Sequence, residues 1–326
     1  MGKNVELPSD KIFTTSVQKD VLVHVDKNMN SKTTLDELIA QNQNTPAENN
    51  AASNKPVGSP SARTMPTSDV DVNLPVAKSS SDETFAIIIA NENYMNESTV
   101  EYAINDGRMF KEYCQKTLGL PEINIHYVEN ATRNNIETEI DWITKVSNAY
   151  GGDARVIIYY AGHGIPNEED GSSYLLPIDG VGDNVRTGCS LADIYKQLGD
   201  LAAKNVIVFM DACFSGSQRG KGMLTSARGV VIKSKAEEPT GKMVVFSAAQ
   251  GTETAYPYRE KEHGMFTYYL LKKLQESNGN CTLGELGDYI KKNVSRYSIV
   301  VNRKSQTPTV SCSTAISGKW EDMTLK

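Results

Sequence analysis

The stretch Arg155-Val-Ile-Ile-Tyr-Tyr-Ala-Gly-His163-Gly164 has the same kind of pattern as a second stretch fifty residues later, Asn205-Val-Ile-Val-Phe-Met-Asp211-Ala-Cys213-Phe-Ser-Gly216. Each is a run of β-branched and aromatic residues that stops at a small, glycine-containing turn. Such runs are typical of strands that are buried on both faces of a parallel sheet. Because open α/β sheets bind ligands beyond the carboxyl ends of their strands, the sequence predicts an imidazole and a thiol at the edge where chemistry occurs.

The composition of the 326-residue chain is that of a globular protein, with 39% hydrophobic and 23% charged residues. A formal net charge of -6 argues against a nucleic-acid-binding surface, which is usually basic. No apolar run has the length of a membrane span, and the first residues lack the apolar core of a signal peptide. We therefore expect a cytoplasmic protein with neither nucleic acid nor membrane as a partner; the oligomeric state stays open.

The chain divides into an amino-terminal arm, residues 1–82, and a larger domain, residues 83–326. Residues 42–82 are rich in Asn, Ser, Pro and Thr and predict a linker, because they cannot bury enough apolar surface to offset the entropy of ordering. From residue 83 onward strands and helices alternate, which predicts a mostly parallel sheet with helices on both faces. The expected strands are 85–90, 123–128, 155–161, 205–211, 243–247 and 309–311, and the expected helices 100–118, 133–149, 190–198, 264–275 and 283–294.

Two residues carry the predicted chemistry. His163 stands between two glycines, and Cys213 lies at the end of its strand and is followed by Phe-Ser-Gly. A neighbouring imidazole favours the reactive thiolate, so the pair predicts a cysteine nucleophile with a histidine base. The backbone amides of Gly164 and Cys213 are candidate donors to an oxyanion. No third member of a triad is evident, and a structural role is assigned to the remaining histidines and cysteines: His24, His126, His263, Cys114, Cys189, Cys281 and Cys312.

The two motifs, Tyr-Tyr-Ala-Gly-His-Gly and Asp-Ala-Cys-Phe-Ser-Gly, resemble those of the caspase-like cysteine peptidases, in particular the metacaspase, paracaspase and bacterial branches. Their separation agrees with the histidine-to-cysteine spacing of caspases. Asn105-Asp106, Ser247-Ala-Ala-Gln and His263-Gly-Met-Phe-Thr support the likeness, which covers roughly residues 84–315.

The resemblance implies a caspase-like three-layer sandwich around a mostly parallel, six-stranded sheet. It also implies a division of the domain into a large portion (83–216), a processing loop (217–241) and a small portion (242–326). The resemblance does not cover the arm, which is interpreted as a prodomain, a latch on the main domain or simply a tail.

The sequence around the cysteine differs from that of true caspases. The caspase motif Gln-Ala-Cys-Arg-Gly is absent, and the chain has Asp-Ala-Cys-Phe-Ser-Gly instead. Asp211 stands where metacaspase-like enzymes carry an acidic residue of the substrate pocket, and Asp106 matches a second acidic position. Two carboxylates favour a cationic side chain, so the resemblance implies cleavage after Arg or Lys and not after Asp. In the alternative interpretation, Asp211 caps a turn and Asp106 is a solvated helix residue.

The expected processing loop is basic. Arg219, Lys221 and Arg228 lie in it, and the bond between Arg228 and Gly229 is the first candidate for self-cleavage. The alternative is an ordinary solvated surface loop.

An acidic run follows the His163 turn and bears on metal binding. Calcium activates some members of the family. However, Glu168, Glu169 and Asp170 lack the regular spacing of a calcium loop and are interpreted as solvated. We therefore expect that no metal or other cofactor is required, with calcium activation as the open alternative.

The favoured function is that of a self-processing cysteine endopeptidase acting on proteins or peptides with Arg or Lys at the cleaved position. A first alternative is a catalytically silent caspase-like domain that serves as an interaction module. A second is another cysteine acyl-transfer enzyme built on the same pair of residues, because a fold alone does not specify the reaction.

Overall fold

The computed structural model describes residues 68–214, 217–218, 222–223 and 234–326. They belong to a compact unit that spans Thr64–Lys326. The predictions for residues 1–67 and for the cleavage candidates Arg219, Lys221 and Arg228 lie outside the described residues.

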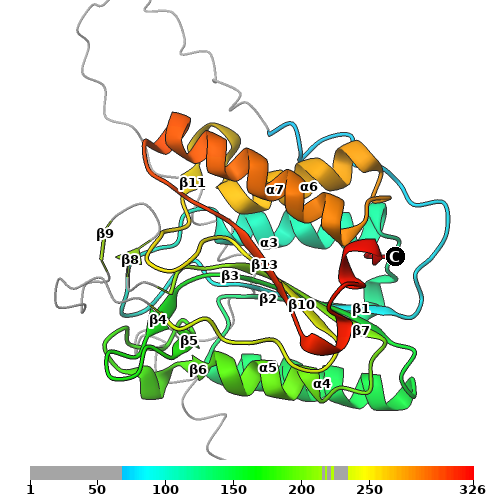
Figure 1. Cartoon of the computed structure of the whole chain (residues 1–326), viewed down its shortest axis with the longest axis horizontal. Helices are drawn as coiled ribbons and strands as arrows, with labels where there is room; N and C mark the ends of the chain where they lie inside the picture. Colours follow the sequence, from blue (N-terminus) through cyan, green and yellow to red (C-terminus); the bar gives the residue numbers. More distant parts are fainter. Residues whose placement is uncertain (1–67, 215–216, 219–221, 224–233) are drawn as a thin grey trace, which may run out of the picture. The chain divides into compact units, whose positions relative to one another are not determined.

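A six-stranded sheet is the middle layer of the unit, with the strand order β13-β10-β7-β3-β1-β2 (Figure 1). All neighbouring strands are parallel except β13, which runs antiparallel to β10. The mostly parallel α/β sheet expected from the sequence is confirmed. Its strands are β1 (Thr84–Ala90), β2 (Ile125–Glu129), β3 (Arg155–Ala161), β7 (Asn205–Asp211), β10 (Met243–Ser247) and β13 (Thr309–Cys312).

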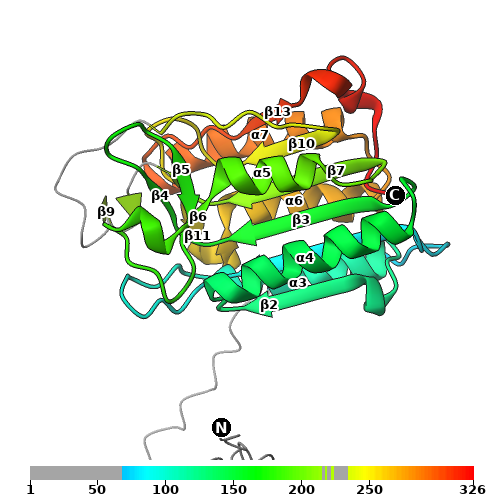
Figure 2. The same ribbon diagram turned by 90° about the horizontal axis from the view of Figure 1, so that it is seen from below.

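Helices form the two outer layers. One face of the sheet carries α3, α6 and α7, and the other carries α4 and α5, which Figure 2 shows in front of the sheet. A π-helix, η1 (Tyr113–Thr117), continues α3. The helices are α3 (Ala103–Glu112), α4 (Arg133–Ala149), α5 (Leu191–Gly199), α6 (Met265–Ser277) and α7 (Leu283–Tyr297).

Short strands gather beyond the carboxyl ends of β3 and β7 (Figure 2). The ranges β4 (Gly164–Pro166), β5 (Ser173–Leu175) and β6 (Cys189–Ser190) pair antiparallel. Two further pairs are β8 (Ser217–Gln218) with β9 (Gly222–Met223), and β11 (Pro257–Tyr258) with β12 (His263–Gly264).

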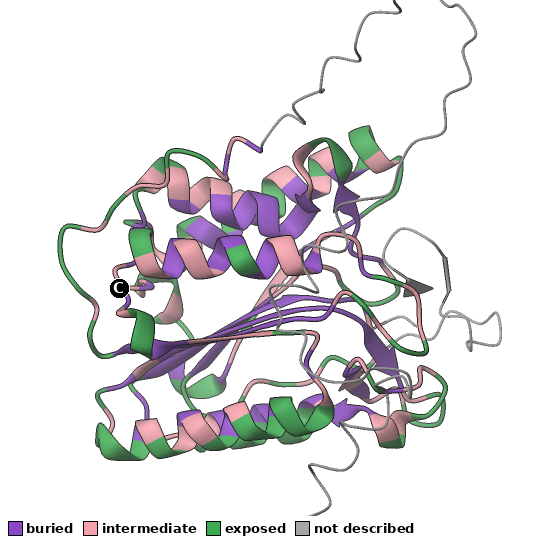
Figure 3. Ribbon diagram, turned by 180° about the vertical axis from the view of Figure 1, so that it is seen from behind, coloured by how far each residue is buried: buried purple, intermediate pink, exposed green. Residues whose placement is uncertain are grey.

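The core lies on both faces of the sheet because successive strand residues point to opposite sides. On β3, Ile157 and Tyr159 pack toward α3 and α6, whereas Val156 and Ile158 pack toward α4 and α5. Every residue of β1 and β7 is buried, which explains why their sequences are continuous apolar runs (Figure 3).

Local sequence signals account for the start of α4. The Thr132 side chain accepts a hydrogen bond from the Asn135 backbone amide, and the Asn135 side chain accepts one from the Thr132 backbone amide. The two bonds form a capping box. Ile136, Ile140 and Ile143 then bury one face against the sheet, while the opposite face is exposed (Figure 3). The expected helix 133–149 is confirmed at both ends.

Two elements start two or three residues later than expected. The helix expected from residue 100 begins at Ala103, because Tyr102 adopts a left-handed backbone conformation with φ of 69°. The strand expected from residue 123 begins at Ile125, because residues Glu122–Asn124 form a 3-10 turn.

The domain begins earlier than the sequence composition indicated. Residues 68–72, which we call the strap, lie against α6 and η1, and Val70 is fully buried. Tyr113 donates its hydroxyl to the Val70 carbonyl at 2.7 Å, and Thr117 donates to the Pro75 carbonyl at 2.8 Å. The linker interpretation is therefore corrected for residues 68–82. This segment is held to the domain by hydrogen bonds to its backbone and by one buried valine, without a large apolar contact. The remaining divisions of the chain stay predictions.

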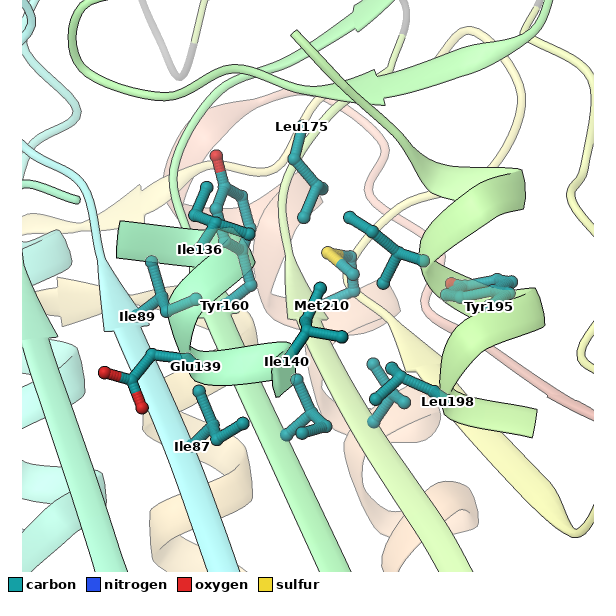
Figure 4. Close-up of a pocket in the computed structure, with 13 residues that line it drawn as sticks. Ile87, Ile89, Ile136, Glu139, Ile140, Tyr160, Leu175, Tyr195, Leu198 and Met210 are labelled. Atoms are coloured by element: carbon teal, nitrogen blue, oxygen red, sulfur yellow. The ribbon is translucent and has the colours of Figure 1, made fainter. Parts of the chain in front are cut away.

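An apolar cavity of about 30 Å³ lies between the sheet and helices α4 and α5 (Figure 4). Ile140 from α4, Leu198 from α5 and Met210 from β7 line it, together with Val208. Side chains that face such a void lose contacts, so filling it stabilises the fold.

We predict that Val208→Ile, which adds one methyl group toward this cavity, raises the free energy of unfolding by about 0.5–1 kcal/mol. Val206 packs on the same face of β7 but does not line the cavity. Val206→Ile therefore overpacks the core and costs about 1–3 kcal/mol. Urea unfolding followed by tryptophan fluorescence compares the two variants, and equal destabilisation by both would contradict the prediction.

Candidate active site

The turns that carry His163 and Cys213 lie side by side. Strands β3 and β7 are parallel neighbours, and Ala161 at the end of β3 stands opposite Asp211 at the end of β7. Beyond this pair the Gly162 amide donates to the Asp211 carbonyl at 3.3 Å. The structure thus brings together the two motifs that are fifty residues apart in the sequence.

Close packing at the His163 turn requires both of its glycines. A Cβ at Gly162 would lie 2.7 Å from the hydroxyl oxygens of Tyr94 and Tyr160. A Cβ at Gly164 would lie 2.5 Å from the Phe214 ring and 2.8 Å from the Cys213 carbonyl oxygen. Only glycine leaves room for these approaches, so the sequence motif reflects the contact between the turns.

The His163 ring is oriented by a backbone carbonyl. Nε2 lies 2.8 Å from the carbonyl oxygen of Ser98, and the side chain is only 3% exposed. Because a carbonyl oxygen can only accept, Nε2 carries the hydrogen, and in the neutral ring Nδ1 is the basic nitrogen. Ser98 is the orienting group that the sequence did not reveal, since any residue type can supply a backbone carbonyl.

Two tyrosines hold the backbone of the same turn. The His163 amide donates to the Tyr94 hydroxyl at 2.7 Å, and the Tyr160 hydroxyl donates to the His163 carbonyl at 2.8 Å. The Tyr94 ring also lies 4.6 Å from the imidazole, centroid to centroid. Burial raises the pKa of Tyr94 to about 12, so its hydroxyl stays neutral at physiological pH.

The Cys213 sulfur lies against the segment that follows β10. The Ala255 amide is 2.6 Å from Sγ, and the Ala255 carbonyl is 3.9 Å from it. Residue Cys213 is 6% exposed, so in this conformation both His163 and Cys213 are almost closed to solvent.

The Gly164 amide points away from the neighbouring strand β5. The Leu176 amide donates to the His163 carbonyl at 3.0 Å, so these two residues stand at a hydrogen-bonded pair position that extends the β4–β5 ladder, although the His163 amide itself donates to Tyr94. Such pairs alternate along an antiparallel ladder, and the next residue, Gly164, therefore directs its amide away from β5.

The Asp211 side chain points to the start of α6. Its Oδ2 accepts a hydrogen bond from the Thr267 hydroxyl at 2.7 Å, and the same hydroxyl lies 2.7 Å from the hydroxyl of Tyr159. Asp211 is buried. Its carboxylate is thus held two residues from Cys213 by a helix that comes from the carboxyl-terminal part of the chain.

Asp106 is a fully buried ion-pair partner and does not face solvent as a solvated helix residue would. Its Oδ1 lies 2.7 Å from Nδ1 of His263, and the Gly264 amide donates to both carboxylate oxygens at 3.0–3.1 Å. The second ring nitrogen of His263, Nε2, lies 2.8 Å from Oδ1 of Asp71. His263 was assigned a plain structural role from the sequence; the structure makes it the link between Asp71 and Asp106.

The charge state of His263 follows from these contacts. Burial by itself lowers its pKa, but the hydrogen bonds and charges of Asp106 and Asp71 outweigh that effect and raise the pKa from 6.5 to about 9. His263 is therefore an imidazolium at neutral pH, and each of its N–H groups donates to a carboxylate.

The acidic run after the His163 turn makes local turn contacts. Asp170 accepts hydrogen bonds from the amide and hydroxyl of Ser172, and Asn167 accepts one from the Glu169 amide. Within the described ranges no three His, Cys, Asp or Glu side chains are grouped so as to hold a metal ion. Nor is any helix in that part of the chain both long enough and apolar enough to span a bilayer.

The two ion pairs of His263 predict a pH-dependent stability. Asp71 from the strap and Asp106 from α3 are the charged groups that face the ring. Since the folded-state pKa of about 9 exceeds the ordinary 6.5, this contribution is complete below pH 6.5 and is lost as the pH rises through 9. We expect a loss of about 3 kcal/mol between about pH 6 and pH 10.

Urea unfolding of the wild type and of Asp71→Asn over this pH range tests the expectation. Asp71→Asn should have the smaller pH dependence, because it removes one of the two charges that raise the pKa. Glu139→Gln is the matched control, since it removes the carboxylate 2.6 Å from His126 on the opposite side of the sheet. An identical pH profile for the wild type and Asp71→Asn would overturn the prediction.

Comparisons with known proteins agree with this arrangement. The caspase domain family model matches residues 83–317. No curated protein matches the chain. Among solved structures, the chain is similar to protein GSU0716 from Geobacter sulfurreducens, with a TM-score of 0.53 and 17% identity over 75% of this chain and 100% of that one. It is also similar to caspase-1 from Spodoptera frugiperda, with a TM-score of 0.49 and 14% identity over 80% of this chain and 95% of that one.

The likeness to the bacterial protein, at this identity, concerns the fold alone. The family match extends over most of the chain and includes both motifs, with His163 and Cys213. The chain therefore belongs to the caspase domain family, which is a family of cysteine peptidases.

Proposed function

We propose that this chain is a cysteine endopeptidase in which Cys213 is the nucleophile and His163 the general base. The observation that carries the proposal is the contact between the two turns at the carboxyl ends of β3 and β7. The hydrogen bond from Nε2 of His163 to the Ser98 carbonyl supports it, because this bond leaves Nδ1 as the proton acceptor.

The proposed reaction has two stages. Nδ1 of His163 takes the thiol proton, and the thiolate of Cys213 attacks the peptide carbonyl carbon. The carbon–nitrogen bond then breaks as the imidazolium returns the proton to the leaving amine, giving a thioester. Water, deprotonated by Nδ1, attacks the thioester and releases the acid and the free thiol.

The amides of Gly164 and Cys213 are the proposed oxyanion donors. The outward direction of the Gly164 amide supports this assignment, because a donor paired within the β4–β5 ladder could not reach a substrate. One such donor contributes on the order of 3 kcal/mol to transition-state stabilisation.

Asp211, assisted by Asp106, is the proposed determinant of specificity for Arg or Lys. Both carboxylates are buried, and both are held by the segment from His263 to Thr267. A desolvated carboxylate stabilises a cation strongly, because water does not screen the interaction. A guanidinium or ammonium group of the substrate is thus the complementary ligand.

The same enzyme is proposed to process itself in the loop between β7 and β10. Six basic residues follow Cys213 before β10: Arg219, Lys221, Arg228, Lys233, Lys235 and Lys242. Since β7 and β10 are parallel neighbours through residues Met243–Ser247, cleavage between them leaves both portions joined by the sheet. The low exposure of His163 and Cys213 also suits a latent form that is cut before it acts.

Substrate preference tests the proposed function. We expect hydrolysis of fluorogenic peptides ending in Arg or Lys, and not of the matching Asp peptide. Asp211→Asn, which keeps the side-chain size but removes the charge, should lower kcat/KM for the Arg peptide by about 100-fold.

Labelling provides the control for this prediction. Iodoacetamide, which carries no charge, should alkylate Cys213 at a similar rate in the wild type and in Asp211→Asn. Preferred turnover of the Asp peptide would refute the specificity. Absence of both turnover and Cys213-dependent labelling would favour a silent interaction module, and synthesis of a new amide bond would favour a different acyl-transfer enzyme.

Intact-mass analysis tests self-processing. The wild type should convert over time to two fragments separated within residues 217–241, with Arg228 the first expected cleavage position, whereas Cys213→Ala should stay intact. Arg228→Gln is the second variant; it should slow the cut or move it to Arg219 or Lys221. Equal masses for the wild type and Cys213→Ala after prolonged incubation would count against self-processing.

A further inference from the structure

A cluster of three charged groups, of which His263 and Asp106 are fully buried, joins the strap to the catalytic domain. His263 in β12 is fully buried, and its two nitrogens lie 2.7 Å from Asp106 of α3 and 2.8 Å from Asp71 of the strap. With His263 protonated, two carboxylates share one positive charge, so the cluster keeps one net negative charge.

The strap is anchored independently of this cluster. Asp69 lies 2.7 Å from Lys261 and 2.9 Å from Lys272, while the fully buried Val70 accepts a hydrogen bond from Tyr113. Although burial opposes the effect, the hydrogen bonds and charges of Lys261 and Lys272 lower the pKa of Asp69, which stays ionised. These contacts present the neighbouring Asp71 carboxylate to His263.

The start of α6 also holds both carboxylates of the proposed pocket. His263 and Gly264 bind Asp106, and Thr267 binds Asp211. Five consecutive residues therefore set the positions of two carboxylates that come from α3 and β7. A change in the charge or position of His263 is transmitted first to Asp106, through a direct hydrogen bond.

We propose that His263 is the positioning residue of the substrate pocket and that Asp71 of the strap fixes its orientation and charge. The strap is then a specificity element contributed by the segment that precedes the domain predicted from the sequence. This inference rests on the proposed Arg/Lys specificity and adds to it the residues that hold Asp106 in place.

The two variants act by different routes. Asp71→Asn leaves the His263 charge to Asp106 alone, which neutralises Asp106 and weakens its attraction for a cationic side chain. His263→Gln removes the charged donor that holds Asp106, so the Asp106 carboxylate is no longer fixed in the pocket. Both variants should raise KM for a cationic substrate without slowing the chemical step.

The test compares an arginyl peptide with its citrullyl analogue, which has nearly the same shape but no charge. In the full-length chain, Asp71→Asn and His263→Gln should lower the ratio of kcat/KM for arginine over citrulline about tenfold, through KM. Asp71→Glu, which restores the charge, should recover part of the ratio. His126→Gln is the matched control. His126 lies on β2, away from the pocket, and it also pairs with a carboxylate, that of Glu139 on α4.

A second readout separates this inference from the proposed function. Iodoacetamide alkylation of Cys213 reports the reactive pair alone, and it should be the same in the wild type, Asp71→Asn and His263→Gln. If the wild type itself shows no preference for arginine over citrulline, the proposed specificity is refuted. If the wild type prefers arginine and both variants keep that preference, or if His126→Gln loses as much of it, the role of His263 is refuted. A parallel change in the alkylation rate would also refute it, because the variants would then disturb the reactive pair itself.

Discussion

The parallel pairing of β3 with β7 is the constraint on which the rest of the site depends. Its register sets Ala161 opposite Asp211, so the turns that follow the two strands meet. The side chains of Phe209 and Asp211 share the face toward α6, and a slip of one residue would direct Asp211 to the opposite face. The buried hydrophobic side chains on both faces therefore determine where the polar groups stand.

The second constraint is the placement of buried charge around the start of α6. Asp106 accepts the hydrogen bond of Gly264, the residue that caps this helix, and a helix amino terminus favours negative charge. His263 supplies a positive charge beside it. Because these groups are out of reach of water, each depends on its partners, and the strap becomes part of the same electrostatic unit through Asp71.

Local sequence patterns predicted the helices and strands whose stabilising contacts lie between residues close together in the chain. The bounds of α4 follow from a capping box and an apolar stripe, and the central strands follow from continuous apolar runs. The composition predicts a linker where the strap lies, because the strap is attached by one valine, a few hydrogen bonds and the ion pairs of two aspartates, which leave no periodicity in the sequence. His263 was assigned a structural role for a similar reason, since its two carboxylate partners are 157 and 192 positions away in the chain.

The amino-acid sequence alone determined the order of strands and helices, and with it the mostly parallel sheet, the two glycine-containing turns and the residues His163 and Cys213 at their tips. Only the tertiary structure decided what each of these groups touches: the Ser98 carbonyl on the imidazole and the Ala255 amide on the sulfur. The physical reason is that periodicity and turn preference act between near neighbours in the chain. The partners at this site are separated by 65 and 42 positions, and only the packing of α3, α6 and the sheet brings them together.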